Sequence, residues 1–169
     1  MVLHVTILEI TNLDNKHTDP NYTSDPYVVV SIDHKQFANT DDHFRTNIQK
    51  DTLNPKYNET FQFEIPKQST FENIDIVFEV YDWRVIGKNA SMGQAQTSLA
   101  CLRNQFVDCD SSMQSEKKGE EVHEQENSTS RKRKLYKKEP QRLKLELSRN
   151  RNAFIEIEMM VDETDRRHY

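Results

Sequence analysis

One aspartate of this sequence is held by its neighbours where a carboxylate could bind a cation. Asp25 stands in the run Thr23-Ser24-Asp25-Pro26-Tyr27, just before the apolar stretch 28–30. Proline fixes its own φ and favours an extended backbone at the residue before it, so Asp25 is predicted to lie at the rim of a strand. A lone carboxylate there is most often a turn residue that accepts hydrogen bonds from local amides. Several converging carboxylates would instead indicate a metal site.

The elements that could bring further acids to this rim are β-strands. Apolar residues alternate with polar ones along most of the chain, which is typical of half-buried strands. The alternation predicts strands at residues 2–10, 28–32, 44–49, 61–65, 74–82, 92–99, 143–147 and 154–161. In the fifth of these, the parity of Ile74, Ile76 and Phe78 extends to Asp82. A second carboxylate is thus predicted at a strand end, beyond the apolar core.

The strand pattern predicts an all-β fold, an eight-stranded antiparallel sandwich without a long amphipathic helix. A chain of 169 residues, 34 % hydrophobic and 30 % charged, fits one core. Residues 1–102 and 140–162 are predicted to form this single domain. Residues 103–139 lose the periodicity and pass from an acidic, serine-rich half to a basic half, which predicts a disordered insertion before the last two strands. Residues 163–169 form a C-terminal tail.

Four motifs in a fixed order carry a family resemblance. They are Leu3-His4-Val5-Thr6-Ile7, Ser24-Asp25-Pro26-Tyr27-Val28, Thr52-Leu53-Asn54-Pro55-Lys56-Tyr57-Asn58-Glu59, and Val80-Tyr81-Asp82 followed by Gly93. Together they resemble the C2 domain, the calcium- and phospholipid-binding module of protein kinase C and synaptotagmin. The resemblance covers the chain outside the insertion and implies a Greek-key sandwich. Because the chain begins on the strand before the first functional loop, it resembles the circular variant of phospholipases.

The resemblance implies a calcium site, and it also identifies the positions at which this sequence lacks the acidic residues of the family. Family acids fall on Asp19, six residues before Asp25, and on Asp82, but the two remaining acidic positions are occupied by Arg84 and Ala90. Calcium prefers six to eight oxygen ligands, and its affinity follows their charge. A guanidinium at Arg84 could also form hydrogen bonds with the carboxylates in place of the ion. We expect Asp19, Asp25 and Asp82 to bind calcium weakly, at about 10⁻⁴ M or worse, or not at all.

Apolar residues at the predicted loop tips are candidates for membrane contact. Tyr22 lies in the first loop, and Trp83, Val85 and Ile86 lie in the loop after the fifth strand. Aromatic and aliphatic side chains outside a core suit the headgroup region of a bilayer. Packing of Trp83 under its own loop is an equally open interpretation, whereas Val85 and Ile86, next to Gly87, are harder to bury.

Basic residues form a third candidate surface. Lys35, Arg45, Lys50 and Lys56 lie on or beside the strands that lead into the Thr52-Leu53-Asn54-Pro55 turn, where some relatives bind phosphoinositides. Acidic residues are interleaved with them, which favours a solvated mixed surface. A denser basic run, within the insertion, contains Arg131, Lys132, Arg133 and Lys134. Near an anionic membrane each of its charges could contribute about 1 kcal/mol, although a solvated linker is the simpler interpretation.

Composition and motifs exclude several function classes. The six histidines are scattered and there are three glycines, so neither a catalytic arrangement nor a glycine-rich phosphate loop is evident. A formal net charge of −5 argues against a nucleic-acid binder, and two cysteines fit a reducing compartment. We expect a cytoplasmic, non-enzymatic module that associates peripherally with anionic phospholipid membranes. The alternative is a sandwich that serves as a scaffold for a protein partner and does not bind lipid.

Overall fold

The chain folds into two stacked β-sheets. The computed structural model describes residues 1–34, 43–66, 71–106, 139–150 and 152–162. Its elements, in chain order, are β1 Val2–Thr11, β2 Pro26–His34, β3 His43–Arg45, β4 Lys56–Glu64, the short 3₁₀ segment η1 Phe71–Asn73, β5 Ile74–Asp82, β6 Ala90–Ser98, a second 3₁₀ segment η2 Leu99–Phe106, β7 Gln141–Glu146 and β8 Phe154–Asp162. The predicted eight-stranded all-β fold is confirmed.

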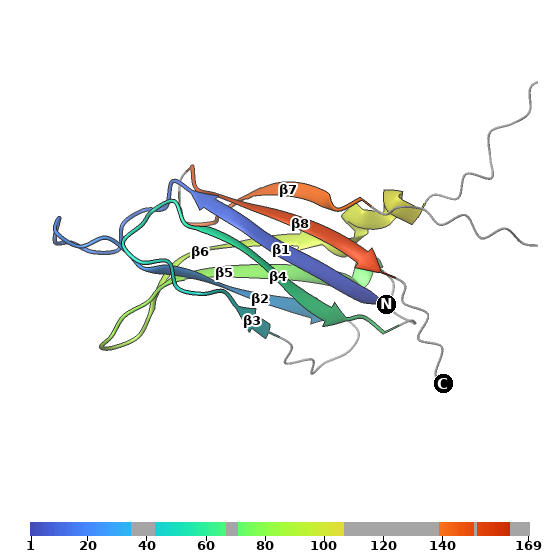
Figure 1. Cartoon of the computed structure of the whole chain (residues 1–169), viewed down its shortest axis with the longest axis horizontal. Coiled ribbons are helices and arrows are strands. Elements are labelled where there is room, and N and C mark those ends of the chain that lie inside the picture. Colours follow the sequence, from blue (N-terminus) through green and yellow to red (C-terminus); the bar gives the residue numbers. More distant parts are fainter. Residues whose placement is uncertain (35–42, 67–70, 107–138, 151, 163–169) are drawn as a thin grey trace, which may run out of the picture.

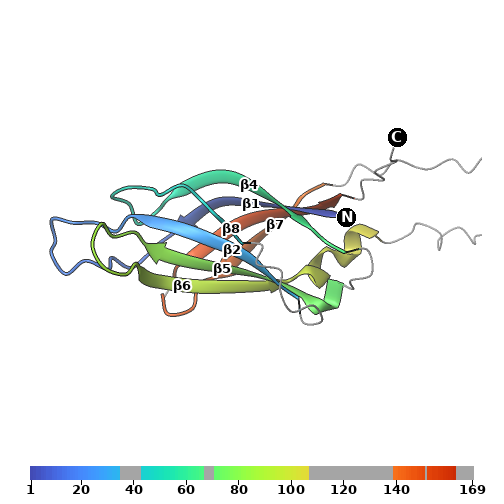
Figure 2. The same cartoon turned by 90° about the horizontal axis from the view of Figure 1, so that it is seen from below.

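Both sheets are four-stranded and antiparallel. One has the strand order β4-β1-β8-β7 and the other β3-β2-β5-β6, and Figures 1 and 2 show them lying face to face along the long axis of the molecule. The first strand lies between β4 and the last strand, β8. Within the described residues, no helix has the length and apolar character that crossing a membrane requires.

The core lies between the sheets and follows from the period-two pattern. Alternate residues of β1, β2, β5 and β8 point inward, and each apolar side chain removed from water stabilises the fold by about 1.5–3 kcal/mol. The residues with no exposed surface include Leu3, Val5, Ile7, Val28, Val30, Ile76, Phe78, Ile155, Ile157 and Met159. Intervening polar residues cover the outer faces. The burial alternation along β1 and β8 is therefore the one that the sequence predicts.

Strand β3 is shorter than the predicted strand at residues 44–49. It ends at Arg45, and the next residue, Thr46, is buried. The Thr46 hydroxyl accepts a hydrogen bond from the Val28 main-chain N–H at 3.0 Å. The Thr46 and Gln49 N–H groups still donate to the Val28 and Pro26 carbonyls at 2.9 and 3.0 Å, so the segment stays beside β2 although the regular strand pairing ends at Arg45.

The predicted boundary between the sandwich and the insertion, after Leu102, falls within a 3₁₀ segment. Segment η2 runs from Leu99 to Phe106, and it is anchored because Leu99 and Leu102 are fully buried. Residues 107–138 and the tail 163–169 lie outside the described residues, so the disorder predicted for the rest of the insertion remains a prediction.

Candidate functional site

Three loops meet at one end of the sandwich, which we call the loop pole. They connect β1 to β2, β3 to β4 and β5 to β6, at residues 12–25, 46–55 and 83–89. Figures 1 and 2 both show them side by side at the left end of the molecule. Main-chain hydrogen bonds join them: Trp83 donates to Asp25 at 2.9 Å, and Thr52 donates to Ser24 at 3.1 Å. The tips predicted to carry the site therefore lie at the same pole.

The turn before β4 holds the other loops in place. The Thr52 hydroxyl accepts from the Asn54 main-chain N–H at 3.1 Å, and the Asn54 side-chain carbonyl accepts from Asn12 at 2.9 Å. The Tyr57 hydroxyl donates to the Pro26 carbonyl at 3.1 Å. Burial of this phenol raises its pKa well above the ordinary value. The motif residues of this turn thus connect the start of the first loop with the start of β2.

Asp82 is the centre of the pole. It is the last residue of β5, as its parity predicts, but its side chain is fully buried because the loops fold over it. One carboxylate oxygen accepts from the Asp25 main-chain N–H at 2.8 Å. The other lies 3.4 Å from Arg84 Nε and 3.5 Å from His17 Nε2. A buried carboxylate is costly unless it is paired and hydrogen-bonded, and these neighbours meet that requirement.

Arg84 is oriented by contacts at both of its ends. Its main-chain N–H donates to the Asn89 side-chain carbonyl at 2.9 Å. The Asn89 amide in turn donates to the Tyr27 hydroxyl at 2.8 Å. Besides Asp82, the guanidinium reaches the Lys16 carbonyl, at 3.5 Å. The positive charge therefore lies between the first loop and the loop after β5.

The other two candidate carboxylates are engaged elsewhere. Asp25 accepts from the Asp51 main-chain N–H at 2.8 Å, in the loop before β4. Asp19 is exposed and accepts from both the main-chain and side-chain N–H groups of Asn21 at 2.9 Å, which closes its own turn. Asp25 contacts Asp82 through its main-chain N–H, and the Asp19 carboxylate has a local role. In the described ranges, no three His, Cys, Asp or Glu side chains are grouped so as to hold a metal ion.

The most exposed large apolar side chains of the pole belong to the loop after β5. Val85 is 80 % exposed and Ile86 is 89 % exposed, whereas Trp83 is half-buried. Tyr22, in the first loop, is 60 % exposed. Gly87 turns the chain at the tip with a φ of 91° and has no atom within 4 Å of its missing side chain. Two adjacent aliphatic side chains thus project from a tight turn into solvent.

The predicted basic residues are distributed over different surfaces. Arg45, on β3, lies over the Tyr27 ring at 5.4 Å from its centroid. Lys56, on β4 in the other sheet, lies 3.8 Å from a Glu9 carboxylate oxygen. Lys50 is exposed in the loop between them. Lys35 and Arg131, Lys132, Arg133 and Lys134 lie outside the described residues.

Sequence reasoning missed the roles of four residues of the pole. His17 and Asp51 contact the two central aspartates, Asn89 orients Arg84, and Lys88 is exposed beside the apolar tip. No periodic signal marks these residues because loop conformation decides which of them turn inward. The sequence offered one signal for these four residues, the positive charge of Lys88 two residues after the apolar pair Val85 and Ile86.

Comparison with known proteins identifies the family of this fold. The C2 domain family model matches residues 1–115. Rat synaptotagmin-1 is 40 % identical over 92 residues, which cover 54 % of this chain and 21 % of that protein. Synaptotagmin-C of Diplobatis ommata is 36 % identical over 100 residues, or 58 % of this chain and 17 % of that protein. The chain therefore spans about a fifth of the length of the curated relatives it matches.

Solved structures show the same fold at low sequence identity. A C2 domain of plant extended synaptotagmin 1 has a TM-score of 0.61 at 20 % identity and covers 94 % of this chain and 91 % of that one. Human GIVD cytosolic phospholipase A2 has a TM-score of 0.64 at 18 % identity, covering 97 % of this chain and 16 % of that one. These likenesses show the sandwich fold.

Proposed function

Because the chain belongs to the C2 domain family, we propose that it docks its loop pole on anionic phospholipid membranes as a peripheral, cytoplasmic module. C2 domains are in general non-catalytic modules that bind calcium and phospholipid. For this chain, the proposal is that lipid docking needs little or no calcium and that the loop pole has no catalytic role.

The observation that carries the proposal is the exposed pair Val85 and Ile86. At 80 % and 89 % exposure, these side chains contribute almost nothing to the core. Fully removing such a side chain from water is worth about 1.5–3 kcal/mol, so a bilayer offers a gain that the isolated protein does not realise. Arg84 and Lys88 flank the pair. An apolar tip between cations suits an anionic headgroup region with acyl chains beneath it.

The contacts of Asp82 support the loss of a strong calcium site. Calcium would need several free carboxylate oxygens. One oxygen of Asp82 accepts from the Asp25 main-chain N–H, and the other lies beside Arg84 Nε. One oxygen of Asp25 accepts from the Asp51 main-chain N–H. The guanidinium of Arg84 and the imidazole of His17 both lie within 3.5 Å of the same Asp82 oxygen, which leaves that oxygen less available to an ion. The surroundings of Asp82 therefore suit the guanidinium of Arg84 better than a bound calcium ion.

Membrane attraction by basic side chains is a second part of the proposal. Lys16 and Lys88 belong to the pole, and each such charge near an anionic surface contributes about 1 kcal/mol; Arg84 contributes less because Asp82 offsets its charge. The basic run that contains Arg131, Lys132, Arg133 and Lys134 would add to this attraction. Arg45, Lys50 and Lys56 contribute less because interleaved acids, such as the Glu9 partner of Lys56, offset them.

Vesicle co-sedimentation tests the proposal. Vesicles containing phosphatidylserine should bind the chain equally in calcium chelator and in added calcium, whereas vesicles of phosphatidylcholine alone should bind it weakly. Absence of binding to phosphatidylserine and phosphoinositide vesicles under both conditions would refute lipid docking. That result would favour the alternative, a scaffold for a protein partner.

A further inference from the structure

Three of the four edge strands carry features that discourage pairing with another strand. Strand β3 has three residues. Strand β4 is bulged at Asn58, whose φ is 53°. Strand β6 is bulged beside Gly93, and the main chain of Gln94 is already bonded to the turn after β7: the Ser148 N–H donates to the Gln94 carbonyl at 2.8 Å, and the Gln94 N–H donates to the Ser148 hydroxyl at 3.2 Å.

Strand β7, the fourth edge, is neither very short nor bulged, and its protection consists of the charged side chains Arg142, Lys144 and Glu146. Residues 141–146 contain neither proline nor glycine and have no positive-φ residue. The Leu147 N–H donates to the carbonyl of Ala153, the residue before β8, at 2.9 Å. Since main-chain groups alternate along a strand, the N–H and C=O groups of Lys144 and Glu146 point away from β8. Within the described ranges, no strand pairs with β7 on that side.

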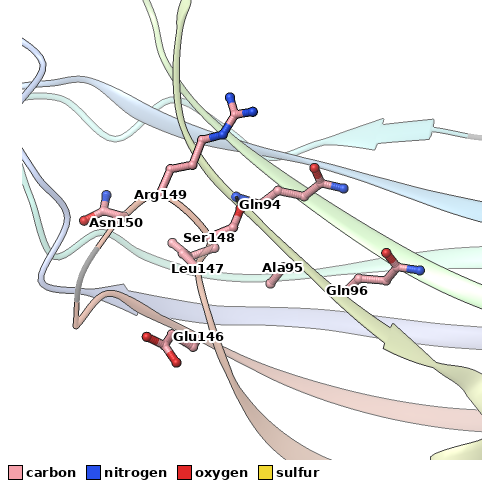
Figure 3. A pocket seen from close by; sticks show the side chains of 8 residues that line it. All are labelled: Gln94, Ala95, Gln96, Glu146, Leu147, Ser148, Arg149 and Asn150. Atoms are coloured by element: carbon pink, nitrogen blue, oxygen red, sulfur yellow. Dashed lines mark hydrogen bonds between the residues drawn. The ribbon is translucent and has the colours of Figure 1, made fainter.

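The inner face of β7 is also incompletely covered. Leu143 and Leu145 pack against the core but remain half-buried. Beside the end of the strand, a groove of about 540 Å³ opens between β7 and β6, with Leu147 and Ala95 in its lining. Figure 3 shows the turn after β7 lying against β6 at this groove. The edge thus combines unpaired main-chain groups with apolar side chains that another strand could cover.

We propose that β7 is a self-association surface, on which β7 of a second copy pairs antiparallel about a two-fold axis at Leu145. In this register, Lys144 lies opposite the partner's Glu146, and by symmetry Glu146 lies opposite the partner's Lys144. The outward main-chain groups of these residues then exchange hydrogen bonds. The two Leu145 side chains meet at the axis and bury each other, and the two sheets become one.

Charge complementarity selects a second copy and this register. A two-fold axis at Lys144 would place that lysine opposite itself, and an axis at Leu143 would place Lys144 opposite the partner's Arg142. Like charges directly opposite each other are destabilising. Lys144 lies 3.6 Å from a Glu156 carboxylate oxygen and 4.9 Å from the centroid of the Phe154 ring, and pairing across the edge exchanges these exposed contacts for the partner's Glu146. Glu146 forms no ion pair among the described residues.

The proposed symmetry also sets the orientation of the two copies. A two-fold axis perpendicular to the sheet turns the second copy end for end, so the two loop poles point in opposite directions. A dimer would therefore present one pole to a membrane while the other faces away. This consequence rests on the proposed function, whereas the self-association itself does not.

Sedimentation velocity of the full chain tests the proposal without lipid. Small edge-to-edge interfaces are weak, so concentrations from about 10 µM to about 1 mM are needed. The mass should rise above the monomer value of 20.0 kDa towards twice that value. Lys144→Glu and Glu146→Lys should each weaken dimerisation by at least about tenfold, because both symmetric pairs become like-charged.

Mixing the two variants gives the sharpest readout. An equimolar mixture should form a heterodimer although neither variant self-associates, because opposite charges then face each other at both positions. Lys56→Glu, on the opposite edge of the same sheet, is the matched control and should dimerise like the wild type. Circular dichroism verifies that each variant is folded. A wild-type chain that stays monomeric throughout, a dimer that tolerates the single reversals, or a mixture that does not associate would each overturn the proposal.

Discussion

Replacing Val85 and Ile86 together by alanine should weaken membrane binding while leaving the fold intact. The double substitution removes about five methyl or methylene groups, each worth about 0.8 kcal/mol when fully transferred from water. Complete insertion would therefore account for about 4 kcal/mol. Insertion to about half of that extent gives about 2 kcal/mol, or about a 30-fold change in affinity. Because the two side chains are 80 % and 89 % exposed, the free energy of unfolding should change by less than about 0.5 kcal/mol.

The assay is a titration of the protein with phosphatidylserine-containing vesicles, followed by co-sedimentation. Urea denaturation of the same samples measures the free energy of unfolding. Met160→Ala is the matched control: this half-buried side chain lies on the outer face of β8, away from the pole. The control should bind vesicles like the wild type. An affinity change of less than about twofold for the double variant would refute the inference that this tip enters the bilayer.

Three further predictions concern the pole and the sandwich. Arg84→Asp should create calcium-dependent stability, since it replaces the cation beside Asp82 by a ligand; millimolar calcium should then raise the unfolding midpoint of the variant and leave that of the wild type unchanged. Gly93→Ala should destabilise the fold by about 2 kcal/mol in urea denaturation, because a Cβ would lie 2.6 Å from the Ser148 carbonyl at a φ of 136°; an unchanged midpoint would contradict this. The hydrogen bond from Arg142 lowers the pKa of Glu156; this carboxylate therefore stabilises the fold fully above the unfolded value of about 4.3 and loses that effect as the pH falls below it, so Glu156→Gln should show a shallower loss of stability on acidification.

The strands could be predicted from the sequence because burial on one face imposes a period of two. Leu3, Val5 and Ile7 alternate with polar residues, and their burial follows. The loops have no such constraint. Asp82 was placed correctly at a strand end, but its complete burial depends on how the loops fold over it. The contact of His17 with Asp82, and that of Asp51 with Asp25, arise from the same folding of loops and have no sequence pattern.

The family pattern supplied what periodicity could not, although only in part. It directed attention to Asp19, yet this carboxylate is used in its own exposed turn with Asn21. It also identified Arg84 as a departure, and the guanidinium lies 3.4 Å from Asp82. Edge features such as the bulge at Asn58 depend on backbone conformation and were beyond sequence reasoning.

The most direct test of the account compares vesicle binding at two calcium concentrations. Wild-type protein is mixed with phosphatidylserine-containing vesicles in calcium chelator and again in about 1 mM calcium, a concentration that would saturate a sensor-type site. The bound fraction should be the same in both samples, and the Val85→Ala and Ile86→Ala double substitution should lower it in both. Binding that appears only in the calcium-containing sample would contradict the proposal that the contacts of Arg84 and His17 with Asp82 have replaced a calcium ion.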